Sequence, residues 1–189
     1  NDYIGLSNGI LDQSCILLSR AGQLTVLDCL DASSRTVPLG AEADVSLVCL
    51  FSGLRTPLSD TDYNRRVDEC REAATTLLQA AKRPMAAPPR LRDVPEDLYR
   101  EHAGALSGRL RRRAEHYFSE QRRVREGVRL WERGELHRLG ELVTESGHSS
   151  VDNYECGNRY LRSAFAALRD CPHVLGARFS GAGFRGCCI

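Results

Sequence analysis

A chain of 189 residues, of which 42% are hydrophobic and 27% charged, can bury a core and form one large domain or one and a half. Its 26 basic and 25 acidic residues nearly cancel, which argues against nucleic acid or an anionic membrane as a partner recognised through overall charge. Because there is no signal peptide and no apolar run long enough to span a bilayer, we expect a cytoplasmic protein.

The first half of the chain alternates extended and helical patterns. Residues 15–19 and 23–29 are apolar runs joined by a glycine-containing turn, which predicts a β-hairpin. Residues 44–51 form a near-continuous apolar run, which predicts a central strand buried on both faces. Residues 62–78 place apolar side chains at helical spacing and predict an amphipathic helix with Asp62 near its start.

The second half is mainly helical. Apolar residues recur every three or four positions over 106–131, which predicts a long helix, and two further helices are expected over 136–143 and 161–168. The arginine runs at 111–113 and 122–123 favour a solvated face over nucleic-acid binding, because aromatic interleaving and net positive charge are missing. The tail is extended, then glycine-rich, then extended again, so strands flank a run of helices and indicate an α+β fold.

The eight cysteines carry no recognisable metal pattern. No Cys-x-x-Cys pair or Cys/His cluster has the spacing of a zinc site, and we expect no metal ligands among them. They are predicted to be reduced, buried small hydrophobic residues of a cytosolic protein.

The stretch NGILDQS, residues 8–14, places a carboxylate and an amide at the edge of an apolar segment. Asp12 could cap a local element, because Asp accepts hydrogen bonds from exposed backbone N–H groups. Alternatively, Asp12 lies at the edge of a cleft and handles a proton. Taken alone, the stretch favours capping, since most Asp-Gln pairs have no chemical role.

A second candidate is the loop that carries Gly181, Gly183 and Gly186. Without a Cβ, its backbone N–H groups can approach a phosphate or a sugar closely. The loop lacks both the P-loop pattern and the setting of a Rossmann turn. A tight crossover between two strands explains the glycines equally well, and only the pairing with NGILDQS shifts the balance toward a ligand site.

Six blocks, taken in chain order, resemble one known family. They are GLSNGILDQS, LTVLDC, DYNRRVDEC, RRRAEHYFSEQRRV, GELHRLGELVTESGHSSVDNYECG and GARFSGAGFRGC. This order, over nearly the whole chain, resembles the sugar-1-kinases of the GHMP kinase family, above all galactokinases. YECG and FSGAGFRGCC stand where galactokinases have YEVS and MTGGGFGGC, and they are most similar to plant-type galacturonokinases.

The resemblance implies ATP-dependent phosphorylation of a sugar at its anomeric hydroxyl. Galacturonate is the implied sugar, and galactose or another sugar is the alternative. The family's Asp beside the anomeric hydroxyl corresponds to Asp12, while Gly9 and Tyr63 match residues that contact the sugar. The third family motif, which closes around the reacting groups, is matched by Gly181, Ala182, Gly183, Phe184, Arg185 and Gly186.

These residues suit the implied chemistry. The Asp12 carboxylate could orient the anomeric hydroxyl and accept its proton as the P–O bond forms. Arg185 stands where galactokinases have Gly, and a guanidinium can grip the C6 carboxylate of galacturonate with paired hydrogen bonds. Arg185 could equally pair with a neighbouring acid or a phosphate, and Arg65 and Arg66 are rivals for the carboxylate.

The block around His148 is expected to be structural. A lone His between two helices is more often hydrogen-bonded than catalytic, and Ser146 and Ser149 are expected to be turn or cap residues. Residues 152–154 are expected to shape the wall of the cleft. A non-catalytic, kinase-like sugar sensor remains a third hypothesis, which the retention of Asp12 disfavours.

The family's early sugar motif and its glycine- and serine-rich ATP motif do not occur here, and the chain opens with Asn rather than Met. We therefore expect a fragment, cut at both ends, that does not turn over by itself. Residues 1–28 would be the end of the N-terminal kinase domain and the domain interface, and 29–189 the C-terminal GHMP kinase domain, a sheet backed by helices. Residues that the missing half would cover are expected to be exposed, among them Ile4, Leu6 and Ile16.

The implied ligands and partners are few. ATP and Mg²⁺ are the implied cofactors, with ligands mostly outside this sequence. The sugar and ATP are the expected partners of a monomer that binds neither nucleic acid nor membrane.

Overall fold

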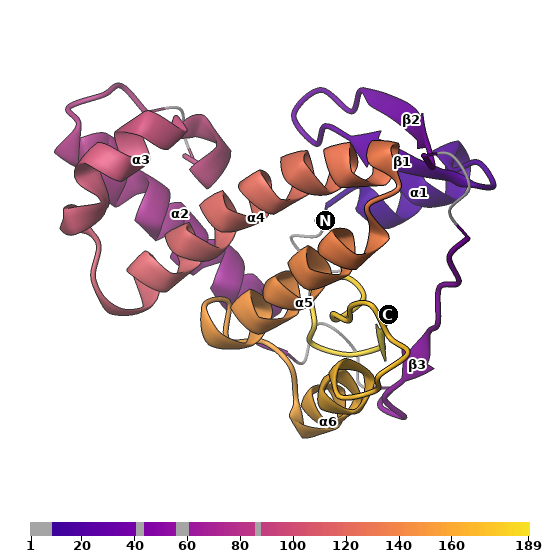
Figure 1. Ribbon diagram of the computed structural model, residues 1–189. Coiled ribbons are helices and arrows are strands. Elements are labelled where there is room, and N and C mark those ends of the chain that lie inside the picture. Colours follow the sequence, from indigo (N-terminus) through magenta and orange to yellow (C-terminus); the bar gives the residue numbers. More distant parts are fainter. Residues whose placement is uncertain (1–8, 41–43, 56–60, 86–87) are drawn as a thin grey trace.

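The computed structural model describes residues 9–40, 44–55, 61–85 and 88–189 (Figure 1). The larger helices are α2 (Tyr63–Ala80), α4 (Gly108–Arg133), α5 (Leu136–Asp152) and α6 (Arg159–Arg169). Shorter ones are α1 (Leu11–Leu18) and α3 (Glu96–His102), with 3₁₀ turns at Leu91–Asp93 and Ala103–Ala105. The strands are β1 (Gln23–Leu27), β2 (Ser34–Pro38), β3 (Leu50–Phe51) and β4 (Cys187–Cys188). This mixture confirms the α+β class.

The main core lies between α2, α3 and α4. Ala74 and Leu77 from α2 meet Ala114 and Phe118 from α4, and Tyr99 of α3 stacks on Phe118 at a centroid distance of 4.1 Å. The apolar period predicted for both long helices is therefore confirmed, because the same side chains form this core. The α3 helix, which the sequence analysis did not predict, covers its end (Figure 1).

A second core holds α6 against the end of the chain. Leu161 and Phe165 of α6 pack with Phe179 and Cys188, all of them at most 3% exposed. The α5 helix lies between the two cores and passes along α4 (Figure 1). Its close approach to the segment at Leu175 requires a glycine, because a Cβ on Gly140 would lie far inside contact distance of the Leu175 carbonyl.

The predicted hairpin of residues 15–29 is wrong in its first strand, whereas the extended segment predicted over 23–29 is confirmed by β1. Residues 11–18 form α1, and β1 pairs instead with β2, antiparallel, with Leu24 opposite Val37. A short apolar run does not distinguish a strand from a helix, and here the helix formed. The hairpin is anchored to the end of α4 by the Trp131 indole, which donates to the Val37 carbonyl at 3.0 Å.

The predicted buried strand over 44–51 is also wrong. Only β3 is extended and paired, with Leu50 opposite Cys188 of β4, and Leu47 is 81% exposed. In the described residues the strands form two two-stranded sheets rather than one sheet backed by helices. The boundary expected near residue 28 falls between β1 and β2, and it stays a prediction.

Exposure at the start of the chain is as expected where it can be assessed. Ile16 is 83% exposed, and no residue of α1 is buried. Ile4 and Leu6 lie outside the described residues. None of the helices in the described ranges has the length and apolar character needed to cross a membrane.

Candidate functional site

One pocket gathers the predicted site residues from three distant parts of the chain. Its volume is about 420 Å³, and it is lined by Gly9, Leu11, Asp12, Tyr63, Ser180, Gly181, Ala182, Gly183, Phe184 and Arg185. Gly186 is the one predicted site residue outside this lining, and its carbonyl accepts a hydrogen bond from the Ser52 N–H at 2.9 Å. The opening motif, the start of α2 and the glycine loop therefore meet at one place.

Asp12 lies in the first turn of α1 with its side chain exposed. The cap position belongs to Ile10 and makes no side-chain capping bond, so capping does not explain Asp12. Asp12 instead lines the pocket. The carboxylate is thus held at the edge of the pocket.

Tyr63 is the first residue of α2 and forms a side of the pocket. Its ring meets that of Phe184 edge-on, with centroids 5.9 Å apart. Burial, and second the negative charge of Asp12, raise the pKa of Tyr63 above its ordinary value. The phenol is therefore neutral at physiological pH and can donate or accept a hydrogen bond.

The glycine loop joins Ser180 to β4, and the Ser180 N–H donates to the Cys187 carbonyl. The loop therefore connects two paired extended segments, as the crossover interpretation predicts. Gly181, Gly183 and Gly186 have φ of 72°, 75° and 94°, a region that other residues rarely adopt. A Cβ on Gly183 would lie 2.6 Å from the Phe179 ring and 2.8 Å from the Cys156 sulfur. A Cβ on Gly181 would meet no atom within 4 Å, so that part of the backbone borders open space that a ligand could enter.

The three candidate arginines differ sharply in their surroundings. Arg185 is exposed, lines the pocket, and forms no ion pair with any described residue. Arg66 is 6% exposed and donates to the carbonyls of residues 154 and 155, so its guanidinium is already committed. Arg65 pairs with Glu69 at 3.1 Å and does not line the pocket.

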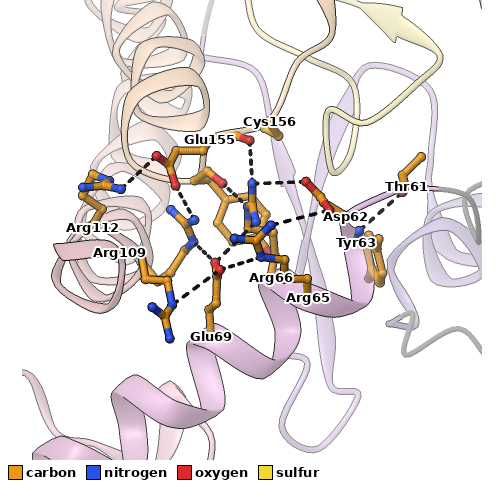
Figure 2. Close-up of polar contacts among 12 residues, drawn as sticks. Thr61, Asp62, Tyr63, Arg65, Arg66, Glu69, Arg109, Arg112, Glu155 and Cys156 are labelled. Atoms are coloured by element: carbon orange, nitrogen blue, oxygen red, sulfur yellow. Dashed lines mark hydrogen bonds and ion pairs between the residues drawn. The ribbon is translucent and has the colours of Figure 1, made fainter.

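Beside the pocket lies an ionic cluster that we define by Arg66 and Glu69 of α2, Arg113 of α4, and Glu155, which follows α5. Figure 2 labels Arg66, Glu69 and Glu155. Glu69 lies at its centre, 2.7 Å from Nε of Arg113 and 3.4 Å from a terminal nitrogen of Arg66. Arg112, which lies outside this cluster, also pairs with Glu155, at 2.9 Å. Burial opposes the charge of Arg113, yet its hydrogen bonds to Glu155 and Glu69 raise its pKa above the ordinary value.

This cluster corrects the predicted solvated arginine face. Arg113 is 1% exposed, although its neighbours Arg111 and Arg112 are not buried. A run of identical residues on a helix spreads over different faces, so one member can turn inward while the others face water.

A second polar network links α4 to α5 and was not predicted. Nδ1 of His116 lies 2.9 Å from the Ser149 hydroxyl, and the Ser146 hydroxyl donates to Glu120 at 2.7 Å. Burial lowers the pKa of His116 from 6.5 to about 4, so the ring is neutral. Both serines are buried within α5, Ser146 in its second half and Ser149 in its last turn, and their side chains bind α4, so their assignment as turn or cap residues is wrong.

His116 was missed although the sequence contained a pattern that could have found it. Arg113, His116, Glu120 and Arg123 recur at steps of three and four, the spacing of one helix face. His148, by contrast, is exposed and meets the Phe165 ring at 5.3 Å.

The structure bears on the metal and cysteine predictions as well. No group of three or more His, Cys, Asp or Glu side chains in the described ranges could hold a metal ion. All eight cysteines are free thiols. Cys156 and Cys188 are buried as predicted, but Cys29 and Cys49 are exposed, so burial does not explain every cysteine.

Comparisons with known proteins agree with the resemblance seen in the sequence. Over its whole length the chain is 47% identical to a galacturonokinase of Arabidopsis thaliana and 34% identical to a galactokinase of Roseiflexus sp., covering 45% and 47% of those proteins. It superposes on the crystal structure of Lactococcus lactis galactokinase complexed with galactose with a TM-score of 0.86 and 29% identity, covering 47% of that chain. No family model matches the chain.

The chain thus spans about half the length of the curated relatives it matches. Similarity in sequence and in fold extends over all of it. Together with the pocket that joins NGILDQS to the glycine loop, this makes the whole chain similar to about half of the galacturonokinase and galactokinase chains.

Proposed function

We propose that the complete protein transfers a phosphoryl group from ATP to the anomeric hydroxyl of a sugar, and that the sugar is galacturonate. The observation that carries the proposal is the single pocket in which Asp12, Tyr63 and the glycine loop meet. The similarity to proteins named galacturonokinase and galactokinase supports the reaction class.

Asp12 is the proposed base. Phosphoryl transfer depends mainly on positioning the attacking oxygen, and a carboxylate beside the hydroxyl can orient it and accept its proton. An anomeric hydroxyl is more acidic than an ordinary alcohol, so the base that accepts its proton need not be a strong one. Gly9 and Tyr63, which line the same pocket, would contact the sugar.

ATP, when bound, supplies the transferred phosphoryl group. The open backbone at Gly9 and Gly181, where a Cβ would meet nothing within 4 Å, fits the close approach of a ligand. The glycine loop would therefore lie against the reacting groups. Mg²⁺, when bound with ATP, would be held by the nucleotide phosphates together with residues outside this sequence, since no group of three or more His, Cys, Asp or Glu side chains in the described ranges could hold a metal ion.

Arg185 is the proposed determinant of the sugar. It is the arginine at the pocket that has no acidic partner among the described residues, whereas Arg66 and Arg65 are engaged elsewhere. Galacturonate differs from galactose by a carboxylate at C6, for which a guanidinium is the best-suited side chain.

The test is ADP release by the complete protein with MgATP and either galacturonate or galactose. Turnover on galacturonate that falls about a hundred-fold or more in Asp12→Asn is the expected result, since a positioned base contributes at least that much. Asp31→Asn is the control, because Asp31 lies in the β1–β2 turn and accepts from the Ser33 N–H. A preference for galactose would support the proposed reaction but contradict galacturonate as the substrate. Sugar binding without turnover would favour the non-catalytic sensor.

A further inference from the structure

Arginine side chains bind the whole backbone of residues 153–157, the segment between α5 and α6. Each of its five successive backbone carbonyls accepts a hydrogen bond from a guanidinium group. Arg113 binds the first, Arg66 the second and third at 2.8 and 3.1 Å, and Arg162 the fourth and fifth at 3.2 and 2.7 Å. We call this segment with its three arginines the bracket.

The bracket holds a backbone that includes the left-handed conformation. Glu155 has φ of 54° and Gly157 has φ of 85°, and this region is unfavourable for a residue with a Cβ, such as Glu155. Glu155 is fixed from two sides, because its carboxylate binds Arg112 and Arg113 while its carbonyl binds Arg66.

Stability alone is a weak explanation for such a cluster. Burying charges costs desolvation energy, and apolar residues of similar volume are often at least as stabilising. Arg113 and Arg66 are nevertheless 1% and 6% exposed. A better account is that the charges select one conformation of the segment out of several.

Two hydrogen bonds connect this segment directly to the glycine loop. The Gly157 N–H donates to the Gly183 carbonyl at 2.7 Å, and the Asn158 side chain donates to the Phe184 carbonyl at 3.2 Å. The same Asn158 accepts from the first N–H groups of α6, so its orientation is fixed. Gly183 and Phe184 line the pocket, and Arg66 lies one helical turn from Tyr63.

We propose that Arg66, Arg113 and Arg162 are positioning residues, which hold the glycine loop in place for sugar phosphorylation through residues 153–158. They touch neither the pocket nor, in this account, the substrate, and they act through the two hydrogen bonds to Gly183 and Phe184. The inference rests on the proposed function for its catalytic consequence. Its structural consequence can be measured independently.

Arg162 is the member to change first. Its side chain is exposed, so Arg162→Ala removes two hydrogen bonds without opening a buried cavity. Arg162→Lys keeps the charge and can reach one carbonyl, but not two with a planar fork. The matched control is Arg169→Ala on the same helix, because the ion pair of Arg169 within the described ranges is with the adjacent Asp170.

Two measurements on the complete protein decide the inference. Hydrogen exchange should become faster over residues 156–158 and 181–186 in Arg162→Ala, with α4 unchanged, and kcat/KM for the sugar should fall about ten-fold, since small misplacements are costly in catalysis. Arg162→Lys should recover part of both effects, and Arg169→Ala should show neither.

The outcomes separate this inference from the proposed function. Unchanged exchange in Arg162→Ala, or faster exchange with unchanged kcat/KM, would overturn the positioning role. If the unaltered protein phosphorylates no sugar, the proposed function fails, and exchange alone then decides whether the bracket holds the loop.

Discussion

At the scale of single residues, the site depends on contacts that the sequence shows only in part. Asp12, Tyr63 and the glycine loop could be placed in one site from their motifs, and they line one pocket. The inward turn of Arg113 could not be foreseen, because burial of an arginine depends on acceptors from α2 and from the α5–α6 segment that are distant in the chain.

Arg185 allows a sharp test of substrate choice. Arg185→Gln keeps a polar side chain but removes the charged fork, so KM for galacturonate should rise about ten-fold or more while KM for galactose changes little. Arg65→Gln is the matched control, since Arg65 is exposed and pairs with Glu69 outside the pocket. Steady-state kinetics on both sugars give the answer, and an equal change for the two sugars would contradict the assignment.

At the scale of elements, periodicity predicted the long helices well and the strands badly. The apolar stripe of α4 continues over many turns, so its meaning was clear, and the helix ends at Gly134 in the left-handed conformation. The runs at 15–19 and 44–51 are short. Their apolar residues, such as Ile16 and Leu47, are exposed rather than buried, so the usual link between apolar runs and core strands fails.

Replacing either of two helical glycines by alanine should change the stability of the protein in different ways. Gly140→Ala on α5 should destabilise the protein by about 2 kcal/mol despite the higher helix propensity of Ala, because the added Cβ meets the rigid Leu175 backbone. Gly127→Ala on α4 meets only the movable Leu139 side chain at 3.3 Å and should be neutral or slightly stabilising. Denaturant unfolding of the complete protein measures both, and equal effects would show that close packing does not set the need for Gly140.

At the scale of the whole molecule, α4 joins the parts. Near its start it supplies Arg113 to the bracket, further along it supplies His116 to the network with α5, and at its end Trp131 anchors the β1–β2 hairpin. Changes in the charge state of this helix should therefore affect the stability of the entire fold.

His116 predicts a pH dependence of stability. Its folded pKa, about 4, lies below the ordinary 6.5, so the unfolded chain binds the proton more readily and stability is lost as pH falls from about 6.5 toward 4. In His116→Gln the decrease in melting temperature between pH 7 and pH 5 should be smaller than in the unaltered protein. His173→Gln, at an exposed position, should keep the full decrease. The same slope in both variants would rule out His116 as its source.

The pairing of β3 with β4 also has a consequence for biosynthesis. The glycine loop and β4 leave the ribosome after every helix described here, while Asp12, Tyr63 and β3 are made much earlier. A nascent chain that already contains α1 to α6 still lacks one wall of the pocket and the strand that pairs with Leu50. Ligand binding in this complete pocket can therefore begin only after the helices have been synthesised.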